Sequence, residues 1–208
     1  MRIVSPSAEL LWITPEARRV IESAGRVCYK SESRATDQSA DAFIRRLVAA
    51  GHESVLEHGV AAFRLVCDRG VSHEIVRHRI ASYSQESTRY CNYTAERFGR
   101  EIAVVRPPDL EGPALAAWEA GASAAEKAYF DMLDAGQSPQ IARSVLPTCL
   151  KTEMIMTANF REWRHFLALR LAPAAHPQIR EIASLAAAAL RAAAPSVFLD
   201  LPPADPQS

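Results

Sequence analysis

The sequence of 208 residues lacks the signatures of several common protein classes. Its four cysteines include no C-x-x-C pair, so we expect neither a zinc ribbon nor a thioredoxin-type redox motif. Only three of its 24 basic side chains are lysines, and 24 acidic side chains bring the formal net charge to zero. Non-specific binding of nucleic acid needs an excess of cations over a broad surface, so this balance argues against it. A local cluster of arginines is still compatible with a neutral chain.

Two glycine-rich phosphate loops are also missing. The chain contains no G-x-G-x-x-G and no G-x-x-x-x-G-K-[ST], which excludes a Rossmann or P-loop nucleotide site. Phosphates would then have to be held by side chains, and the planar guanidinium of arginine suits them best. No run approaches the roughly 20 apolar residues that span a bilayer, and the first residues do not resemble a secretory leader. We therefore expect a cytoplasmic protein that does not contact membranes.

Hydrophobic periodicity predicts an α+β (mixed α/β) fold in which a central sheet is flanked by long helices. The predicted strands are residues 2–5, 59–68, 102–106 and 153–158. The first predicted helix has Pro15 near its first turn. The other predicted helices cover residues 39–50, 71–82, 113–135, 139–145, 161–171 and 177–194. No repeat or long linker interrupts the pattern, so we expect one domain over residues 1–200 and a frayed tail over 201–208.

The densest polar cluster covers residues 77–90. On the predicted helix, consecutive side chains at 77–79 point about 100° apart and cannot serve one small ligand from one face. If the chain beyond this helix is extended, Gln85, Ser87 and Arg89 point to one side and offer an amide, a hydroxyl and a guanidinium. That set suits a phosphate and a pyrimidine edge. A nucleophilic Ser87 would need a base and an orienting group, and the neighbouring sequence supplies neither.

Four blocks of sequence, in order, resemble those of a known enzyme family. The first is the H-E-S-V-L-E-H segment at 52–58, and the second is R-H-R at 77–79, followed after seven residues by Ser87 and then R-Y. The third is A-R-S-V-L-P at 142–147, and the last is the N-F-R-E-W-R-H-F segment at 159–166 with a closing L-R at 169–170. These blocks resemble the flavin-dependent thymidylate synthases.

The resemblance implies a fold, a reaction and a set of ligands. It implies a non-Rossmann flavin-binding fold in a methyltransferase that makes dTMP from dUMP. The methylene group would come from methylenetetrahydrofolate and the hydride from FAD that NADPH has reduced. The resemblance also implies a homotetramer whose active sites are shared between subunits. No enzyme nucleophile would attack the pyrimidine.

The family's functional residues map onto matching positions of this chain. Arg170 is the implied catalytic residue, because a guanidinium beside the uracil ring would stabilise negative charge as the ring is activated. The implied FAD contacts are Ser54, Arg77, His78, Arg79, Gln85, Asn159, Phe160, Arg161 and His165. The implied dUMP contacts are Glu74, Ile75, Val76, Arg77, Gln85, Glu86, Ser87, Thr88, Arg89, Arg143 and Arg170. No histidine pair has the i, i+4 spacing of a helical metal site, so we predict no metal.

Two departures and two alternatives accompany this interpretation. Many family members have Asn-Glu where this chain has Ser-Gln at 84–85, and many have a histidine where this chain has Ala174. Either change could alter flavin or folate geometry. One alternative is a single-stranded nucleic-acid module that stacks bases on an interleaved platform of Tyr83, Arg89, Tyr90 and Tyr93. It predicts salt-sensitive oligonucleotide binding without flavin. The other alternative is a degenerate member that binds nucleotide without turnover.

Overall fold

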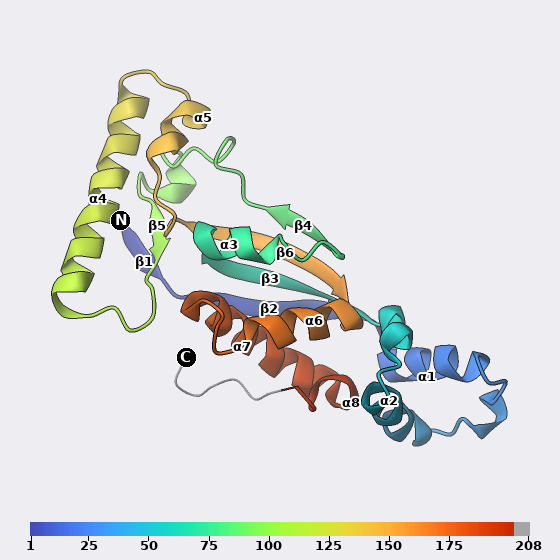
Figure 1. Ribbon diagram of the computed structural model, residues 1–208. Helices are drawn as coiled ribbons and strands as arrows, with labels where there is room; N and C mark the ends of the chain where they lie inside the picture. The colour runs from blue at the N-terminus through green and yellow to red at the C-terminus, as the bar shows by residue number, and fades with distance from the viewer. Residues whose placement is uncertain (202–208) are drawn as a thin grey trace. The chain divides into compact units, whose positions relative to one another are not determined.

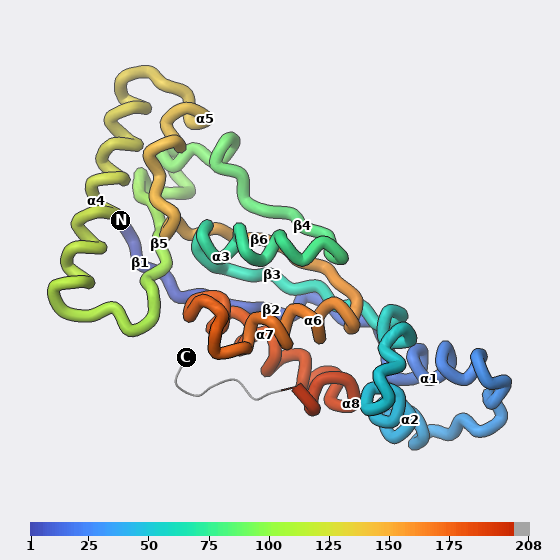
Figure 2. Tube along the Cα trace, viewed as in Figure 1, coloured from blue at the N-terminus to red at the C-terminus, as the bar shows by residue number. Residues whose placement is uncertain are grey.

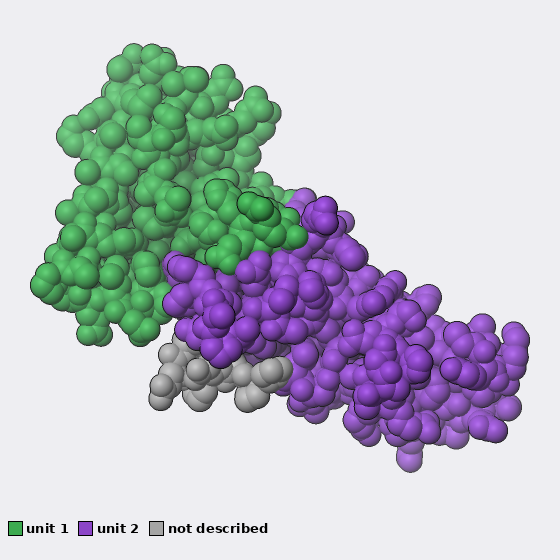
Figure 3. Space-filling view, viewed as in Figure 1, with its two compact units in different colours: residues 1–7, 66–77, 84–154 green, residues 8–65, 78–83, 155–208 purple. Residues whose placement is uncertain are grey.

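The computed structural model describes residues 1–201 and shows a mixed α/β protein, as predicted (Figures 1 and 2). The chain forms two compact units (Figure 3). Unit 1 consists of residues 1–7, 66–77 and 84–154, and unit 2 of residues 8–65, 78–83 and the chain from residue 155 on. Each unit is therefore assembled from three separate stretches of chain. That all of residues 1–200 form one domain stays a prediction.

Four strands form the main sheet in the order β2-β3-β6-β4. These strands are β2 (Ser7–Ile13), β3 (Val60–Asp68), β6 (Lys151–Asn159) and β4 (Ala81–Gln85). A second, two-stranded parallel sheet pairs β1 (Arg2–Val4) with β5 (Ala103–Val105). β3 is mostly buried on both faces, with Arg64 exposed and Val60 and Val66 half-buried, in agreement with its nearly continuous apolar sequence. β2, a half-exposed strand at the edge of the sheet, was not predicted from the sequence.

The helices of unit 1 are α3 (Arg69–Ile75), α4 (Gly112–Asp134), α5 (Pro139–Ala142) and the 3₁₀ helices η3 (Glu96–Phe98) and η4 (Arg143–Val145). α4 has a proline in its first turn and ends just before Gly136, whose φ of 86° favours glycine. The ring of Tyr129, on α4, is fully buried and lies edge-on to Tyr93 and Phe130. These aromatic contacts form the centre of the unit 1 core.

The helices of unit 2 are α1 (Ala17–Val27), α2 (Ser39–Ala49), α6 (Phe160–Arg170), α7 (Pro177–Ala193), α8 (Pro195–Phe198) and the 3₁₀ helices η1 (Glu32–Arg34) and η2 (Glu53–His58). α6 packs on α7 and η2, while α8 packs on α2 and α7. Trp163 of α6 is fully buried, lies 4.9 Å from the ring of Phe63, and donates its indole N–H to the carbonyl of Ala61 at 3.1 Å. A hydrogen-bonded indole of this kind fixes α6 against β3.

One predicted helix is wrong. The helix expected over 71–82 is the shorter α3, and β4 begins at Ala81. Asp68 caps α3 by accepting the N–H of Val71 at 2.6 Å, but the chain leaves the helix after Ile75. His78 is then buried within unit 2. Residues 77–79 therefore do not spread around a helix. Tertiary burial of His78 overrides the local helical pattern.

The remaining predicted helices match the observed ones to within about two residues, apart from α5, which ends three residues early and continues as the 3₁₀ helix η4. Within residues 1–201, no helix is long and apolar enough to cross a membrane. Leu201 lies in a bend, and the rest of the predicted tail is outside the described residues.

Candidate functional site

The start of α6 positions several predicted site residues in unit 2. Asn159 is the last residue of β6 and caps α6, because its side-chain oxygen accepts the N–H of Glu162 at 2.9 Å. This cap satisfies one of the free N–H groups at the helix start. It also fixes the backbone from which Arg161, Glu162 and His165 project.

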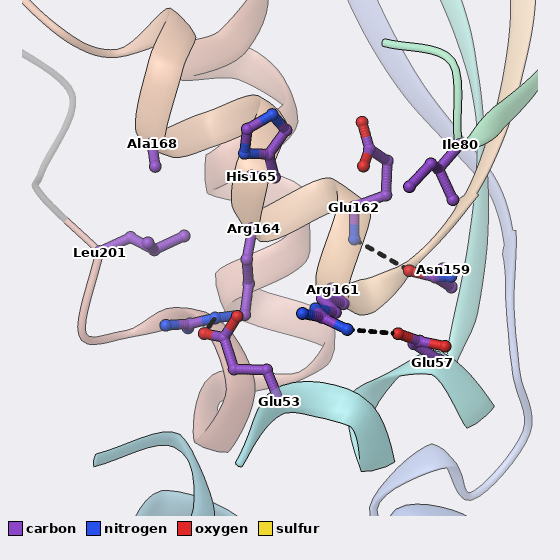
Figure 4. A pocket seen from close by; sticks show the side chains of 10 residues that line it. All are labelled: Glu53, Glu57, Ile80, Asn159, Arg161, Glu162, Arg164, His165, Ala168 and Leu201. Atoms are coloured by element: carbon purple, nitrogen blue, oxygen red, sulfur yellow. Dashed lines mark hydrogen bonds and ion pairs between the residues drawn. The ribbon is translucent and has the colours of Figure 1, made fainter. Parts of the chain in front are cut away.

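These side chains line a cavity of about 540 Å³ (Figure 4). Its lining residues are Glu53, Glu57, Ile80, Asn159, Arg161, Glu162, Arg164, His165, Ala168 and Leu201. Arg161 donates to Glu57 at 2.7 Å, and both side chains are about half exposed. The cavity thus combines hydrogen-bond donors with apolar surface from Ile80, Ala168 and Leu201.

Arg164 is the most strongly bound arginine of this cavity. Its side chain is 9% exposed and forms a bidentate salt bridge with Asp200, with N–O distances of 2.6 and 2.7 Å. It also donates to Glu53 at 3.1 Å and to the carbonyl oxygen of Val197. The hydrogen bond from Arg164 holds the pKa of Asp200 below its usual value. Arg164 therefore ties the chain beyond α8 to α6 and η2.

A buried chain of hydrogen bonds lies beside this cavity. His78 Nδ1 lies 3.2 Å from Glu162 Oε1, and Arg170 Nε donates to His78 Nε2 at 3.1 Å. The His78 and Glu162 side chains are only 3% and 7% exposed. The His78 ring also packs edge-on against Phe166 and His165, at 5.0 and 5.6 Å between centroids. Burial lowers the pKa of His78, although its contact with Glu162 opposes the shift.

Ligand atoms of His78, Glu162 and His165 lie within 4.8 Å of one another, which is close enough to share a metal ion. Both ring nitrogens of His78 already have hydrogen-bond partners, however. Coordination through His78 would require one of these bonds to break. That the protein binds no metal stays a prediction.

In unit 1, the end of β4 forms a polar network. Gln85 donates through Nε2 to the hydroxyls of Ser72 and Thr152, at 2.9 and 3.1 Å. The carboxylate of Glu86 lies 3.0 Å from Lys151 Nζ and accepts from the Tyr93 hydroxyl at 3.3 Å. Gln85 and Glu86 are therefore held in place by side chains of unit 1.

A second cavity of about 450 Å³ lies beside this network in unit 1. Arg69, His73, Thr88 and Arg143 line it together with the loop before β6. Arg143 Nη1 donates to the Thr88 hydroxyl at 3.3 Å, and Arg69 Nη1 donates to the carbonyl of Glu86 at 3.4 Å. Two guanidiniums, a histidine and a hydroxyl form a donor set suited to a phosphate group.

Comparison with known proteins assigns the family. The model of the family described as thymidylate synthase complementing protein matches residues 9–196. The flavin-dependent thymidylate synthase of Mycolicibacterium gilvum (strain PYR-GCK) is 36% identical over 201 residues, covering 87% of this chain and 78% of that protein. The enzyme of the same name from Geobacter sulfurreducens is 35% identical over 203 residues, covering 93% and 86%. This chain belongs to the flavin-dependent thymidylate synthase family. It is therefore an enzyme of the methyltransferase class.

A solved structure shares the fold of this family member. The crystal structure of the UMP/dUMP methylase PolB from Streptomyces cacaoi, bound with 5-Br dUMP, superposes with a TM-score of 0.79. The sequence identity is 24%, and the match covers 96% of each chain. The likeness extends over nearly the whole fold.

The residues that the family resemblance implied as FAD contacts fall into three groups. Asn159, Arg161 and His165 line the unit 2 cavity, and the buried His78 packs against His165. Arg77, Arg79 and Ser54 are exposed and do not line it. Phe160 is fully buried against Phe198, and Gln85 belongs to the unit 1 network, so the structure does not bring either to this cavity.

The residues implied as dUMP contacts are mostly in unit 1. Thr88 and Arg143 line its cavity, whereas Ile75 is fully buried and could offer a ligand only its backbone. Glu74 is half buried, Val76 is exposed, and Arg170 belongs to the His78 chain in unit 2. The expected alternation of Gln85, Ser87 and Arg89 is wrong, because β4 ends at Gln85. The Ser87 hydroxyl then accepts the Arg89 N–H at 3.3 Å within a turn.

Several residues that the structure brings to these sites were not predicted from the sequence, and three of them bear on the chemistry. Arg69 and His73 line the unit 1 cavity, and Glu162 contacts His78. Only Glu162 carried a local signal, since N-x-x-E at 159–162 is the spacing of a helix cap with an acid in the first turn. That signal locates a helix start. It does not identify the partner 84 residues away.

Proposed function

We propose that this protein converts dUMP to dTMP, with methylenetetrahydrofolate as the carbon donor and FADH₂, regenerated by NADPH, as the hydride donor. The observation that carries the proposal is the buried chain of Glu162, His78 and Arg170. It joins the R-H-R motif to the closing arginine of the last motif block, 92 residues away, in a member of this enzyme family. A solvated basic surface would have no need for such a buried connection.

The unit 1 cavity is the proposed site for the phosphate of dUMP. Arg69 and Arg143 offer guanidiniums, and Thr88 offers a hydroxyl already oriented by Arg143. Gln85 is the proposed reader of the pyrimidine edge, because two hydroxyls hold its amide nitrogen and so fix the direction of its carbonyl oxygen. A protein of the same fold binds 5-Br dUMP, which supports a pyrimidine nucleotide as the ligand.

Arg170 is the proposed catalytic residue. Negative charge develops on the uracil ring as C5 is activated, and a guanidinium held beside it would stabilise that charge. The Nε bond to His78 orients this guanidinium before the substrate arrives, so little reorganisation would be needed during the reaction. No covalent bond from the enzyme to the pyrimidine is proposed.

The unit 2 cavity is the proposed site for part of the flavin. Its donors and apolar surfaces fit a flavin ring, but its charge does not fit a diphosphate by itself. Two arginines line it beside three glutamates, and both arginines are already paired. The exposed Arg79, one residue before the lining Ile80, is the proposed cation for the diphosphate within this chain. When bound, the flavin would supply the hydride.

We propose that a second copy of the chain completes the flavin site, because the acidic cavity leaves the diphosphate short of cations. This agrees with a homotetramer that shares its active sites between subunits. We also propose that the protein works in the cytoplasm, where dUMP, folate and NADPH are available.

Two measurements test the function together. Purified protein should show the visible absorbance of a bound flavin and should oxidise NADPH faster when dUMP is present. Arg170→Ala should abolish dTMP formation, whereas Ser87→Ala and Cys91→Ala should keep some activity because neither residue acts as a nucleophile. A colourless protein that neither binds FAD nor consumes NADPH would refute the proposal, as would a trapped covalent adduct between Ser87 or Cys91 and the pyrimidine.

A further inference from the structure

Glu162 is a buried carboxylate that the motif blocks assign to no ligand. Its side chain is 7% exposed and lies on the first turn of α6, where the Asn159 cap fixes its backbone N–H. A buried carboxylate is costly unless a partner compensates it. The partner within reach is the His78 ring, at 3.2 Å. Both position and burial therefore tie Glu162 to His78.

The two neighbours of His78 determine which nitrogen of its ring carries the proton. Arg170 Nε–H can only donate, so the His78 Nε2 that faces it at 3.1 Å must be unprotonated. A carboxylate can only accept, so the Nδ1 that faces Glu162 must carry a proton. Only the neutral Nδ1–H tautomer satisfies both contacts. Lowering of the His78 pKa by burial is consistent with a neutral ring.

We infer that Glu162 is a positioning residue for Arg170: it holds His78 in the Nδ1–H tautomer, which leaves Nε2 free to accept Arg170 Nε–H and orient the guanidinium. The hydrogen bond made by one ring nitrogen sets the state of the other, as in metal-binding histidines whose second nitrogen donates to a carboxylate. Because a guanidinium is planar and rigid, fixing Nε–H also fixes the direction of its two terminal nitrogens.

Groups other than Glu162 also hold His78 in place. The Tyr83 hydroxyl donates to the backbone carbonyl of His78 at 2.7 Å. The rings of Phe166 and His165 pack edge-on against the imidazole. Neither of these ring contacts selects a tautomer, because both act on the carbon framework of the ring. The selection therefore comes from the two polar neighbours, and Glu162 is the one that holds the Nδ1 proton.

Loss of the Glu162 carboxylate should weaken the tautomer preference. In Glu162→Ala, the buried Nδ1–H loses its acceptor, and only the Nε–H of Arg170 still favours an unprotonated Nε2. In the fraction of molecules that protonate Nε2 instead, the Nε–H of Arg170 loses this acceptor. Glu162→Gln keeps an acceptor oxygen at the same reach, so it should keep the tautomer. The inference about catalysis rests on the proposed function, but the tautomer claim does not.

The test combines nitrogen NMR with kinetics on the full-length protein. In ¹⁵N-histidine-labelled protein, with His78 assigned by the signal lost in His78→Gln, the wild type and Glu162→Gln should show protonated Nδ1 and unprotonated Nε2. Glu162→Ala should show a detectable fraction of His78 protonated on Nε2 and should lower kcat for dTMP formation by about tenfold or more, the order of the effect when a carboxylate that orients a metal-binding histidine is removed. Glu162→Gln should stay within a few fold of wild type, as should Glu9→Ala, which removes an exposed carboxylate of unit 2.

Three outcomes would overturn the inference. The first is an Nε2–H tautomer of His78 in the wild type, which is detected without any variant. The second is an unchanged tautomer population in Glu162→Ala, and the third is loss of the Nδ1–H tautomer in Glu162→Gln. If the expected tautomers appear but the wild type makes no dTMP, the proposed function fails while the positioning of Arg170 by Glu162 stands.

Discussion

Replacement of Arg164 by alanine should detach the end of the described chain from α6. The substitution removes the bidentate salt bridge with Asp200, the hydrogen bond to Glu53 and the donor to the Val197 carbonyl. Glu53 and Asp200 are 32% and 49% exposed, so water can solvate both carboxylates once they are unpaired. The main loss is then the charged donor to a carbonyl of the buried Val197, together with packing of the arginine stem.

We expect Arg164→Ala to lower the free energy of unfolding by about 2–3 kcal/mol. This lies between the cost of breaking an ion pair at the surface and the cost of breaking a fully buried one. In urea unfolding at fixed protein concentration, that loss corresponds to a midpoint lower by roughly 1 M. Arg161→Ala is the matched control, because it removes an arginine of the same helix whose ion pair is about half exposed. It should leave the midpoint unchanged. Equal shifts in the two variants would refute the argument from burial.

The pH dependence of the same pair adds a second check. Arg164 holds the pKa of Asp200 below its usual value of about 3.9, so the pair stabilises the fold above that pH. Its contribution is lost as the pH falls through the depressed pKa. The difference in stability between wild type and Arg164→Ala should therefore shrink below about pH 4. A difference that grows in acid would contradict the assignment of the pair.

Three further predictions follow from burial. Gly59→Ala should lower the free energy of unfolding by about 1–3 kcal/mol, because a Cβ at this position would lie 2.5 Å from the fully buried ring of Phe160. Gly121 on α4 faces open space, so Gly121→Ala should instead raise the free energy of unfolding by about 0.5–1 kcal/mol in the same urea assay. Burial raises the pKa of the Cys67 thiol to about 12, so a thiol reagent at neutral pH should leave Cys67 unmodified in the native protein; labelling before unfolding would contradict this. The pKa of His78 is lowered mainly by burial, with Arg170 and His165 lowering it further and Glu162 opposing the shift. The neutral ring therefore stabilises the fold above about pH 6.5, and urea midpoints should fall more steeply with acidification in wild type than in His78→Gln.

Most elements of the fold could be predicted because their boundaries are encoded locally. Gly51 and Gly136 follow the ends of α2 and α4 with φ of 72° and 86°, conformations that glycine adopts without strain. The elements that failed depend on distant partners. β2 is an edge strand, and the chain after Ile75 leaves the helix where His78 becomes buried against residues more than 80 positions away.

The candidate site likewise has a part that the sequence predicts and a part that it does not. The types of its residues followed from the motif blocks, because R-H-R and N-x-R are contiguous strings. Their partners did not. Nothing in the sequence indicates that Glu162 faces His78, or that Arg69 and His73 share a cavity with Arg143. Such pairings arise from the packing of α6 and of the loop before β6, which periodicity does not describe.

The interleaving of the two units along the chain sets an order for folding during synthesis. Unit 1 has all of its residues once residue 154 has been made, whereas unit 2 still lacks α6, α7 and α8. Of these helices, α6 packs on η2 and α8 packs on α2, and both partners are translated more than 100 residues earlier. The apolar faces of the early helices must therefore stay exposed until the last quarter of the chain emerges. This is the interval in which the nascent protein is most prone to aggregate and most dependent on chaperones.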